Sequence, residues 1–426
     1  MSTLKAVRGT RDLLPPETAL WNRIEATARS VFARYNFGEI RTPIFEDTGL
    51  FARGVGEETD IVSKEMYTWE DRARAQSEKT QSLTLRPENT AGVVRAYIEH
   101  KLGETGQLQK LYYIGPQFRR ERPQKGRYRQ FSQIGAEVIG PPSAGSESPL
   151  RDAEVLEMLA TLLDELGITG WTLHINSVGS AADRARYNEA LRAVLVSVAP
   201  RMCIDCQRRA VTNPLRVLDC KVAEDQPIID TLPRIADSLD EDSKTHFAAV
   251  IAALDAAGVP YSRNSRLVRG LDYYTRTTFE FTHGGLGAQN ALLGGGRYDG
   301  LSEAIGGPKA PGIGFAMGED RLVLTLQALE AATPEKVDAF IAPLGESMNP
   351  AALALARELR RAGLTVELGE GSFRLKKSFE AADKTARRIV ILGEDELQSG
   401  ILTVKDFATG TQTKVPRGEL AAVLTK

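Results

Sequence analysis

The chain has 426 residues, of which 42% are hydrophobic and 26% are charged, and its formal net charge is -2. This length predicts two or three domains, and this composition excludes an intrinsically disordered protein. A net charge so close to zero also excludes a protein that coats nucleic acid through a uniformly basic surface, so any contact with RNA must use local basic patches.

The N-terminal segment MSTLKAVRGTRDLLPPE has no continuous apolar stretch of the kind found in a signal peptide, and nowhere do about 18 uncharged apolar residues follow one another. We therefore expect a cytoplasmic protein with no membrane partner. Three cysteines are too few for a secreted disulfide framework and agree with a reducing compartment.

The first part of the chain mixes helices with strands. A proline pair precedes apolar residues that recur every three or four positions, which predicts an amphipathic helix from Trp21 to Tyr35. A strand is expected through Ile40 and Pro43. A second strand is expected from Ser82 to Arg86, and a helix from Thr90 to His100.

The segment from Lys110 to Gly140 has two strand-like runs on either side of the polar sequence RERPQKGR, which predicts a long antiparallel hairpin with a basic loop. Antiparallel neighbours argue against a doubly wound parallel sheet. One acid, Glu121, stands among six basic residues of this loop: Arg119, Arg120, Arg122, Lys125, Arg127 and Arg129. Because like charges repel, the natural partner is an anion such as a triphosphate or an RNA backbone, and a solvated basic loop is the alternative.

On the return strand of this hairpin, residues two apart share a face: Arg129, Phe131, Gln133, Gly135 and Glu137. This face offers a guanidinium, an aromatic ring, an amide and a carboxylate. Gly135 is expected to leave a gap where a small ligand lies against the backbone. The alternative is the wet outer face of an antiparallel sheet, where alternating polar residues are ordinary.

A helix is expected from Leu150 to Gly167, and a largely helical insertion of about 90 residues follows it. The insertion holds Cys203, Cys206 and Cys220, which form a C-x-x-C pair plus one. A closed zinc site requires four ligands, and His174 and His246 are distant in sequence, so we expect inert thiols and no bound metal.

Glycine-rich segments follow the insertion. LVRGLDYYTRTTFEF places Arg269 and a glycine before Tyr273 and Tyr274, a combination that lines a pocket or, alternatively, belongs to a buried aromatic strand. GGGRYDGL and PGIGFAMGEDRL come next, the latter leading into Arg321. Neither the P-loop motif nor G-x-G-x-x-G occurs, which argues against a P-loop or Rossmann site. Beyond Thr333 the pattern alternates between strands and helices, which predicts a separate small α/β domain.

Together these segments resemble the class II aminoacyl-tRNA synthetases, and RGLDYY with GGGRYDGL resembles the signature segments of the histidyl-tRNA synthetase family. RGTRDLLP, TLRPENTAG, FRRERPQKGRYRQFSQIGAEVIG and GFAMGEDRL extend the resemblance over nearly the whole chain. It implies an α+β fold with an antiparallel catalytic sheet flanked by helices (residues 1–174 and 261–328), a helical insertion (175–260) and an anticodon-binding α/β domain (334–426).

The resemblance also implies an activity: activation of histidine by ATP with Mg2+, transfer to the 3' end of tRNA(His), and a homodimer with an interface around Pro43 to Arg53. It assigns ATP to Arg119, Glu121, Arg127, Phe131 and Arg321, with Arg119 on the α-phosphate and Phe131 on adenine. It assigns the histidine amino group to Glu88 and Thr90, and the imidazole to Gln133, Glu137, Tyr273 and Tyr274. Arg269, with Arg119, would act on the reacting α-phosphate.

Three positions depart from the family pattern, namely Ser132, Arg120 and Asn89, and none of them removes a phosphate ligand. Two other functional interpretations remain: the histidine-sensing regulatory subunit of ATP phosphoribosyltransferase, and a non-catalytic RNA-binding module. The regulatory subunit typically lacks the C-terminal module and has eroded catalytic segments. Because this chain has both the C-terminal module and the catalytic segments, the enzyme is the favoured interpretation.

Overall fold

The computed structural model describes residues 3–57, 59–71, 80–124, 126–286, 290–329 and 336–425. The chain divides into two compact units, Met1–Ala331 and Ala332–Lys426, which are taken in turn. Thr333 and Pro334, where the sequence pattern changes, lie outside the described residues.

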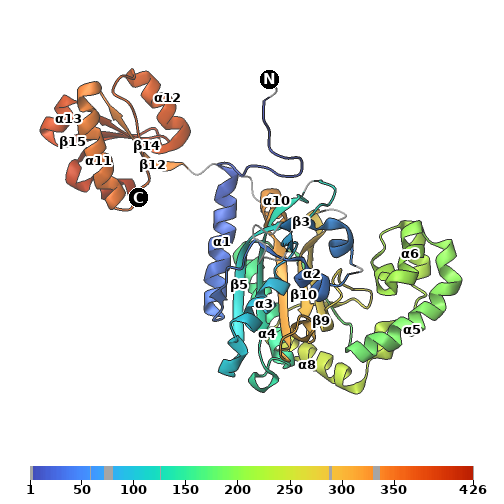
Figure 1. The fold of residues 1–426 in the computed structure, drawn as a ribbon. Coiled ribbons are helices and arrows are strands. Elements are labelled where there is room, and N and C mark those ends of the chain that lie inside the picture. Colours follow the sequence, from blue (N-terminus) through green and yellow to red (C-terminus); the bar gives the residue numbers. More distant parts are fainter. Residues whose placement is uncertain are drawn as a thin grey trace. The chain divides into compact units, whose positions relative to one another are not determined.

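An antiparallel-rich sheet forms the centre of the N-terminal unit (Figure 1). Its strands are β1 (Gly38–Glu39), β5 (Gln109–Phe118), β6 (Gln130–Ile139), β7 (Trp171–Ser177), β8 (Ser262–Arg263), β9 (Thr275–His283), β10 (Ala291–Arg297) and β11 (Gly312–Gly318). They lie in the order β1-β5-β6-β11-β10-β9-β7-β8, and the pairs β1-β5 and β7-β8 at the two edges are parallel. The predicted hairpin is confirmed as β5 and β6.

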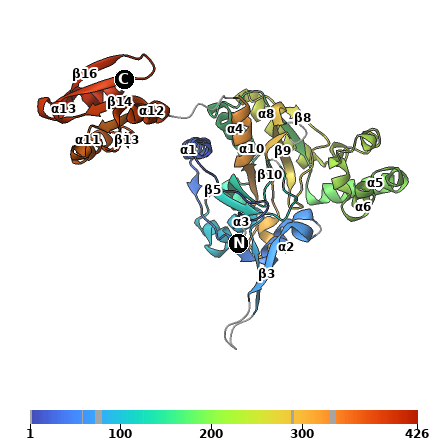
Figure 2. The ribbon, with the colours of Figure 1, turned by 90° about the horizontal axis from the view of Figure 1, so that it is seen from above.

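Helices cover one face of this sheet, and Figure 2 shows three of them, α4, α8 and α10, along one side of the strands. The covering helices are α1 (Glu17–Arg34), α4 (Pro149–Glu165), α8 (Glu241–Ala257) and α10 (Glu319–Leu329). Ile134 and Ala136 of β6 and Phe315 of β11 are buried in the same core as Phe32 of α1. Because side chains alternate along a strand, the intervening residues of β6 and β11 point to the opposite face.

That opposite face is partly covered by a small sheet in the order β2-β4-β3 and by short helices. These elements are β2 (Phe45–Asp47), β3 (Tyr67–Asp71), β4 (Gln81–Leu85), α2 (Thr48–Val55), α3 (Thr90–Glu99), α9 (Leu301–Ala304) and the π-helical turn η1 (Ile61–Glu65). The expected strand through Ile40 and Pro43 is wrong. The Arg86 guanidinium donates to the carbonyls of Thr42 and Pro43, at 3.1 and 3.4 Å, and the chain leaves the sheet there.

The chain between β7 and β8 is helical, as expected. Besides α8, it contains α5 (Ala181–Val198), α6 (Ile204–Thr212), α7 (Gln226–Ile229) and the 3-10 turns η4 (Ala199–Arg201), η5 (Pro214–Asp219), η6 (Ala223–Asp225) and η7 (Ile235–Ser238). A capping box starts α5, because Ser180 accepts from the Asp183 N–H and Asp183 accepts from the Ser180 N–H. Helix α8 packs on the central sheet, whereas α5 and α6 share a separate small core with Cys206 and Tyr187.

The C-terminal unit has a mixed sheet in the order β13-β12-β14-β15-β16. Its elements are β12 (Val337–Pro343), α11 (Asn349–Arg361), β13 (Val366–Leu368), α12 (Leu375–Thr385), β14 (Ala386–Leu392), α13 (Glu394–Ser399), β15 (Ile401–Asp406), β16 (Gln412–Pro416) and α14 (Leu420–Thr425). The expected alternation of strands and helices is confirmed, whereas β16 and α14 were not predicted from the sequence.

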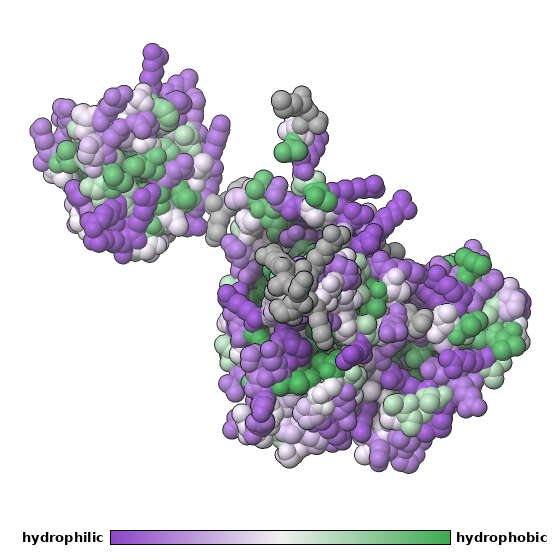
Figure 3. Space-filling model, in the orientation of Figure 1, coloured by the Kyte–Doolittle hydropathy of each residue, from purple (hydrophilic) through white to green (hydrophobic). Residues whose placement is uncertain are grey.

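The visible surface of both units is largely hydrophilic with small scattered hydrophobic patches (Figure 3). Within the described ranges, none of the helices combines the length and the apolar character that crossing a membrane would require.

Candidate active site

Glycines of two neighbouring strands make room for the site on the face of the sheet away from α1. A side chain on Gly314 of β11 would collide with the Glu137 carboxylate, and one on Gly294 of β10 would collide with the Arg269 guanidinium. A Cβ on Gly296 would lie 2.8 Å from the Tyr274 ring. The glycine-rich segments therefore hold their neighbours' functional side chains close to the backbone.

A cavity of about 630 Å³, which Gly294 helps to line, opens on this face. It brings together six side chains that the sequence singled out for phosphate or adenine: Arg119, Glu121, Arg127, Phe131, Arg269 and Arg321. Gln133 also lines it, as do Arg209 and Arg216 from the insertion. Lys125, which the sequence analysis counted in the basic loop, lies outside the described residues.

Arg119 directly follows β5, and two contacts hold its guanidinium group. Its Nε donates to the Pro87 carbonyl at 2.8 Å, and its guanidinium lies 5.2 Å from the centre of the Phe131 ring. A hydrogen bond and a cation–π contact together restrict the rotamers of a long side chain. The remaining N–H groups of Arg119 are thereby aimed at a fixed place in the cavity.

Two other arginines are each paired with a carboxylate of the cavity wall. Arg127 donates to Glu121 at 3.1 Å, and Arg269 donates to Glu280 at 2.8 Å. Sequence reasoning missed Glu280, which lies opposite Gly294 in the pairing of β9 with β10. These pairs orient the arginines while leaving other guanidinium N–H groups available for an anion.

Arg321, near the start of α10, donates to the Ala291 carbonyl at 2.6 Å. Burial lowers the pKa of Arg321, and the nearby positive charges of Arg127 and Arg269 lower it further. A guanidinium remains charged at any physiological pH, so Arg127, Arg269 and Arg321 place like charges near one another in the cavity. An anionic ligand would relieve that repulsion.

A second group of polar residues lies deeper, beneath the cavity. Thr90 Oγ1 donates to Glu137 Oε1 at 2.7 Å, and the Tyr298 hydroxyl donates to Glu137 Oε2 at 2.6 Å. Glu88 accepts from the backbone N–H groups of Thr90 and Ala91, at 2.7 and 3.0 Å. Glu88 and Glu137 are both buried, so two acids face one small region with few cations.

Burial raises the pKa of Glu137 to about 8, because the hydrogen bonds from Tyr298 and Thr90 offset only part of the desolvation and the nearby Glu88 opposes ionisation. Burial also raises the pKa of Glu88, against the backbone N–H groups of Ala91 and Thr90 and the charge of Arg119. Buried carboxylates of this kind are suited to a cationic or hydrogen-donating ligand.

Aromatic rings close the side of this deeper group. The rings of Tyr273 and Tyr274 are 4.7 Å apart, and Tyr273 meets the edge of Tyr298 at 5.9 Å. The expectation of an open gap over Gly135 is wrong, because the Tyr113 phenol from β5 fills the space that a Gly135 side chain would occupy. Sequence reasoning missed Tyr113 and Tyr298, although Tyr298 lies within GGGRYDGL.

The expected site residues thus fall into two connected sets. Arg119, Glu121, Arg127, Phe131, Gln133, Arg269 and Arg321 line the cavity, whereas Glu88, Thr90, Glu137, Tyr273 and Tyr274 form the buried group beneath it. Gln133 Oε1 is buried and has no hydrogen-bond partner within the described ranges. Such an unpaired acceptor is costly unless a ligand supplies a donor. The alternative of a wet outer face is therefore wrong for this strand.

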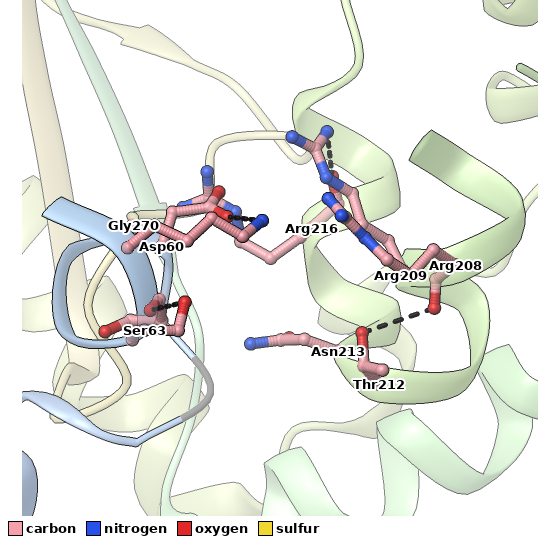
Figure 4. A pocket seen from close by; sticks show the side chains of 10 residues that line it. Asp60, Ser63, Arg208, Arg209, Thr212, Asn213, Arg216 and Gly270 are labelled. Atoms are coloured by element: carbon pink, nitrogen blue, oxygen red, sulfur yellow. Dashed lines mark hydrogen bonds and ion pairs between the residues drawn. The ribbon is translucent and has the colours of Figure 1, made fainter. Parts of the chain in front are cut away.

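A smaller hollow of about 220 Å³ adjoins the cavity and is bordered on one side by α6 of the insertion (Figure 4). Arg208, Arg209 and Arg216 line it from the insertion, facing Asp60 and Ser63. Arg209, Arg216, Asp60 and Gly270 also line the larger cavity.

Of the three departures from the family pattern, Ser132 and Arg120 lie outside the cavity lining. Ser132 pairs with Pro116 and occupies the strand position between Phe131 and Gln133, which faces away from the cavity. The Arg120 guanidinium lies 5.9 Å from the centre of the Tyr67 ring of β3.

Comparison with known proteins connects this geometry to one family. The family profile described as Histidyl-tRNA synthetase matches residues 9–322, and the profile described as Anticodon binding domain matches residues 338–426. The histidine–tRNA ligase of Koribacter versatilis (strain Ellin345) is 74% identical over 98% of this chain and 95% of that protein. The histidine–tRNA ligase of Solibacter usitatus (strain Ellin6076) is 57% identical over 99% of both chains.

A solved structure gives the same result. The crystal structure of apo S. aureus histidyl-tRNA synthetase matches with a TM-score of 0.79 and 39% sequence identity, and the match covers 100% of both chains. The expected fold, an antiparallel sheet flanked by helices with a C-terminal anticodon-binding domain, is confirmed.

Proposed function

Because the chain belongs to the histidyl-tRNA synthetase family and attaches histidine to tRNA, we propose that its glycine-lined cavity performs both steps of that reaction. In the first step the histidine carboxylate attacks the α-phosphate of ATP. In the second step the terminal ribose hydroxyl of tRNA attacks the resulting mixed anhydride.

The arginines of the cavity provide what the first step requires. A carboxylate and a triphosphate repel each other, and negative charge develops on the phosphoryl oxygens in the transition state. Arg119 and Arg269 would contact those oxygens, while Arg127 and Arg321 would hold the outer phosphates. A fixed cation at the reacting oxygens lowers the barrier by about 3 to 4 kcal/mol, comparable with an oxyanion-hole donor.

The adenine would lie against the face of Phe131, which shares the cavity wall with Arg119. Glu121, which pairs with Arg127, is a carboxylate beside the expected position of the outer phosphates. Mg2+ prefers oxygen ligands, so carboxylates of the cavity wall would help to hold it there, where it would neutralise negative charge of the phosphates. Glu121 fits that requirement, as do the cavity's other glutamates, Glu65 and Glu280.

The buried acidic group would recognise histidine. The α-amino group would lie at Glu88 and Thr90, and the imidazole N–H groups would meet Gln133 and Glu137, whose acceptor oxygens are buried. Tyr273 and Tyr274 would enclose the ring. An amino acid with no ring N–H for Gln133 would leave its buried Oε1 unpaired, which costs about 1 to 3 kcal/mol.

The same proposal covers the domains and partners. Residues 1–174 and 261–328 form the catalytic part, residues 175–260 the insertion that approaches the acceptor end of tRNA(His), and residues 334–426 the part that reads the anticodon. The basic hollow beside α6 supports a contact between the insertion and RNA. A cytoplasmic homodimer with Pro43 to Arg53 in its interface completes the proposal.

The observation that carries the proposal is the presence of Arg119, Arg269 and Arg321, from three distant segments, in the wall of one cavity. The test is histidine-dependent exchange of pyrophosphate into ATP by the Arg269→Ala variant. Exchange should fall by two to three orders of magnitude, in line with the ~3 to 4 kcal/mol above, while the fold and tRNA affinity are kept.

Arg34→Ala is the matched control, because Arg34 lies on α1 and pairs with Glu165 outside the cavity. It should leave exchange unchanged. Full exchange activity in Arg269→Ala would remove Arg269 from the mechanism. Absence of exchange in the unaltered protein, with histidine still bound, would favour the regulatory-subunit alternative.

A further inference from the structure

Three cysteines and one aspartate of the insertion meet at one point. The Sγ atoms of Cys203, Cys206 and Cys220 and a carboxylate oxygen of Asp225 all lie within 4.8 Å of one another. Cys206, Cys220 and Asp225 are buried, and Cys203 is partly exposed. Four groups of the kinds that bind metals therefore converge in a nearly closed place.

The distances are close to those of four ligands around one ion. Around a tetrahedral Zn2+ ion with a Zn–S distance of about 2.3 Å, ligand atoms are about 3.5 to 3.8 Å apart. Cys203 Sγ lies 3.9 Å from Cys220 Sγ, and Cys220 Sγ lies 3.3 Å from Asp225 Oδ2. A small inward movement of the remaining atoms would bring all four to bonding distance.

Backbone groups around the cluster favour negatively charged ligands. The Val222 N–H donates to Cys220 Sγ at 3.4 Å, and the Cys203 N–H donates to Asp225 Oδ1 at 3.0 Å. Cys203 is also the N-cap of α6, so the N-terminus of that helix lies at the cluster. Donors of this kind orient metal ligands and stabilise thiolates.

Other arrangements of these residues fit less well. The cysteines are free, and a disulfide needs sulfur atoms about 2.05 Å apart. A [4Fe–4S] cluster binds each thiolate to a different iron atom, and a [2Fe–2S] cluster divides its four ligands between two irons, so both spread the ligands more widely than here. In a core of neutral thiols the Cys220 thiol and the Cys203 N–H donate to Asp225. The buried carboxylate would then still lack a cationic ion-pair partner among the described residues, whereas buried charges are normally paired or metal-bound.

We propose that Cys203, Cys206, Cys220 and Asp225 bind one Zn2+ ion in a closed, structural site. Three thiolates select a soft ion, and four protein ligands leave no open position for catalysis. The sequence analysis expected inert thiols because it found no fourth ligand near the cysteines. Asp225 supplies that ligand.

The proposed zinc site lies at both ends of the chain segment that carries the three arginines of the smaller hollow. Cys203 and Cys206 lie at the start of α6, and Cys220 directly follows η5. The arginines of the hollow lie on the chain between these ligands, Arg208 and Arg209 in α6 and Arg216 in η5 (Figure 4). The ion would fasten both ends of this segment and thereby fix the positions of the three guanidinium groups.

The test begins with the full-length protein, loaded with zinc under reducing conditions and freed of excess metal by gel filtration. Elemental analysis should find one zinc ion per chain. Since the chain has three cysteines, a thiol reagent that modifies all three should release that one ion. Rapid reaction of all three thiols with no release of zinc would overturn the proposal.

Substitutions at position 225 separate a metal ligand from a structural hydrogen bond. Asp225→Asn keeps an acceptor for the Cys203 N–H but should lose zinc, whereas Asp225→Cys should retain it. Glu224→Gln, at the exposed neighbouring residue, is the matched control and should keep one ion. Cobalt-loaded protein should show thiolate-to-cobalt charge-transfer absorption in the unaltered chain and not in Asp225→Asn. Equal metal content in Asp225→Asn and the unaltered chain would contradict the assignment of Asp225.

Discussion

Replacing Glu137 by glutamine removes a carboxyl group whose pKa burial raises from 4.5 to about 8, with little change in side-chain size. Because the folded protein holds this proton more tightly than the unfolded chain, the favourable contribution is full below pH 4.5 and is lost as the pH rises towards about 8. A difference of about 3.5 pKa units corresponds to about 5 kcal/mol in the free energy of unfolding. Loss of one good hydrogen bond to Tyr298 or Thr90 subtracts about 1 kcal/mol from the gain.

Calorimetry at two pH values measures this effect. At about pH 5 the Glu137→Gln variant should unfold at nearly the same temperature as the unaltered chain, and at about pH 9 its N-terminal unit should unfold several degrees higher. With about 2.1 cal/mol/K of unfolding entropy per residue, 5 kcal/mol corresponds to a shift of about 7 °C for this unit. At about pH 9, where Glu137 is ionised, the same variant should also lose histidine-dependent exchange, since the imidazole loses its anionic partner.

Glu319→Gln is the matched control. Burial raises the pKa of Glu319 to about 7, because the contact with the Ser132 hydroxyl offsets only part of the desolvation. Glu319→Gln should therefore stabilise the protein above about pH 7 while keeping exchange activity. Parallel stability–pH curves for Glu137→Gln and the unaltered chain would refute the reasoning, because they would mean that Glu137 carries no buried charge.

Two further substitutions test the geometry. Tyr298→Phe removes the hydroxyl that donates to Glu137 and should raise KM for histidine by about 10- to 100-fold with little effect on KM for ATP, since a hydrogen bond to a charged group contributes about 1.5 to 3 kcal/mol. The control is Tyr187→Phe, which removes a buried hydroxyl bonded to the Pro233 carbonyl and should leave both KM values unchanged. Equal effects of the two substitutions would contradict the role of Tyr298. Gly294→Ala should displace Arg269 and lower kcat at least tenfold in steady-state exchange kinetics. Gly300→Ala, with open space around the added methyl group, should leave kcat unchanged. Full activity of both variants would show that Gly294 is not needed to place Arg269.

The basic hairpin that contributes to the cavity could be predicted from the sequence because it depends on local features. A run of arginines between two alternating strands identifies a basic hairpin, and alternation alone places Phe131, Gln133 and Glu137 on one face. The register between strands was not predictable in this way. Tyr113 pairs with Gly135 across the hairpin and fills its gap, which a list of residues along one strand does not reveal.

The deeper half and the cysteine cluster depend on contacts between distant segments. Tyr298 reaches Glu137 from another part of the chain, and a buried aromatic residue in a glycine-rich segment carries no distinctive spacing. Asp225 is one of many acids and stands in no metal-binding motif with the cysteines, so only the fold identifies it. The prediction of a strand through Ile40 and Pro43 was wrong for a similar reason, because the distant Arg86 guanidinium binds the carbonyls of Thr42 and Pro43.

The strand order has a consequence for synthesis of the chain on the ribosome. Strand β6 pairs with β5 on one edge and with β11 on the other, and β11 follows only after the whole insertion. At 5 to 20 residues per second, the roughly 170 residues between them take about 10 to 30 seconds to emerge. During that interval the free edge of β6 is a template for wrong pairing, so nascent chains of this length are the stage at which aggregation or chaperone binding should be greatest.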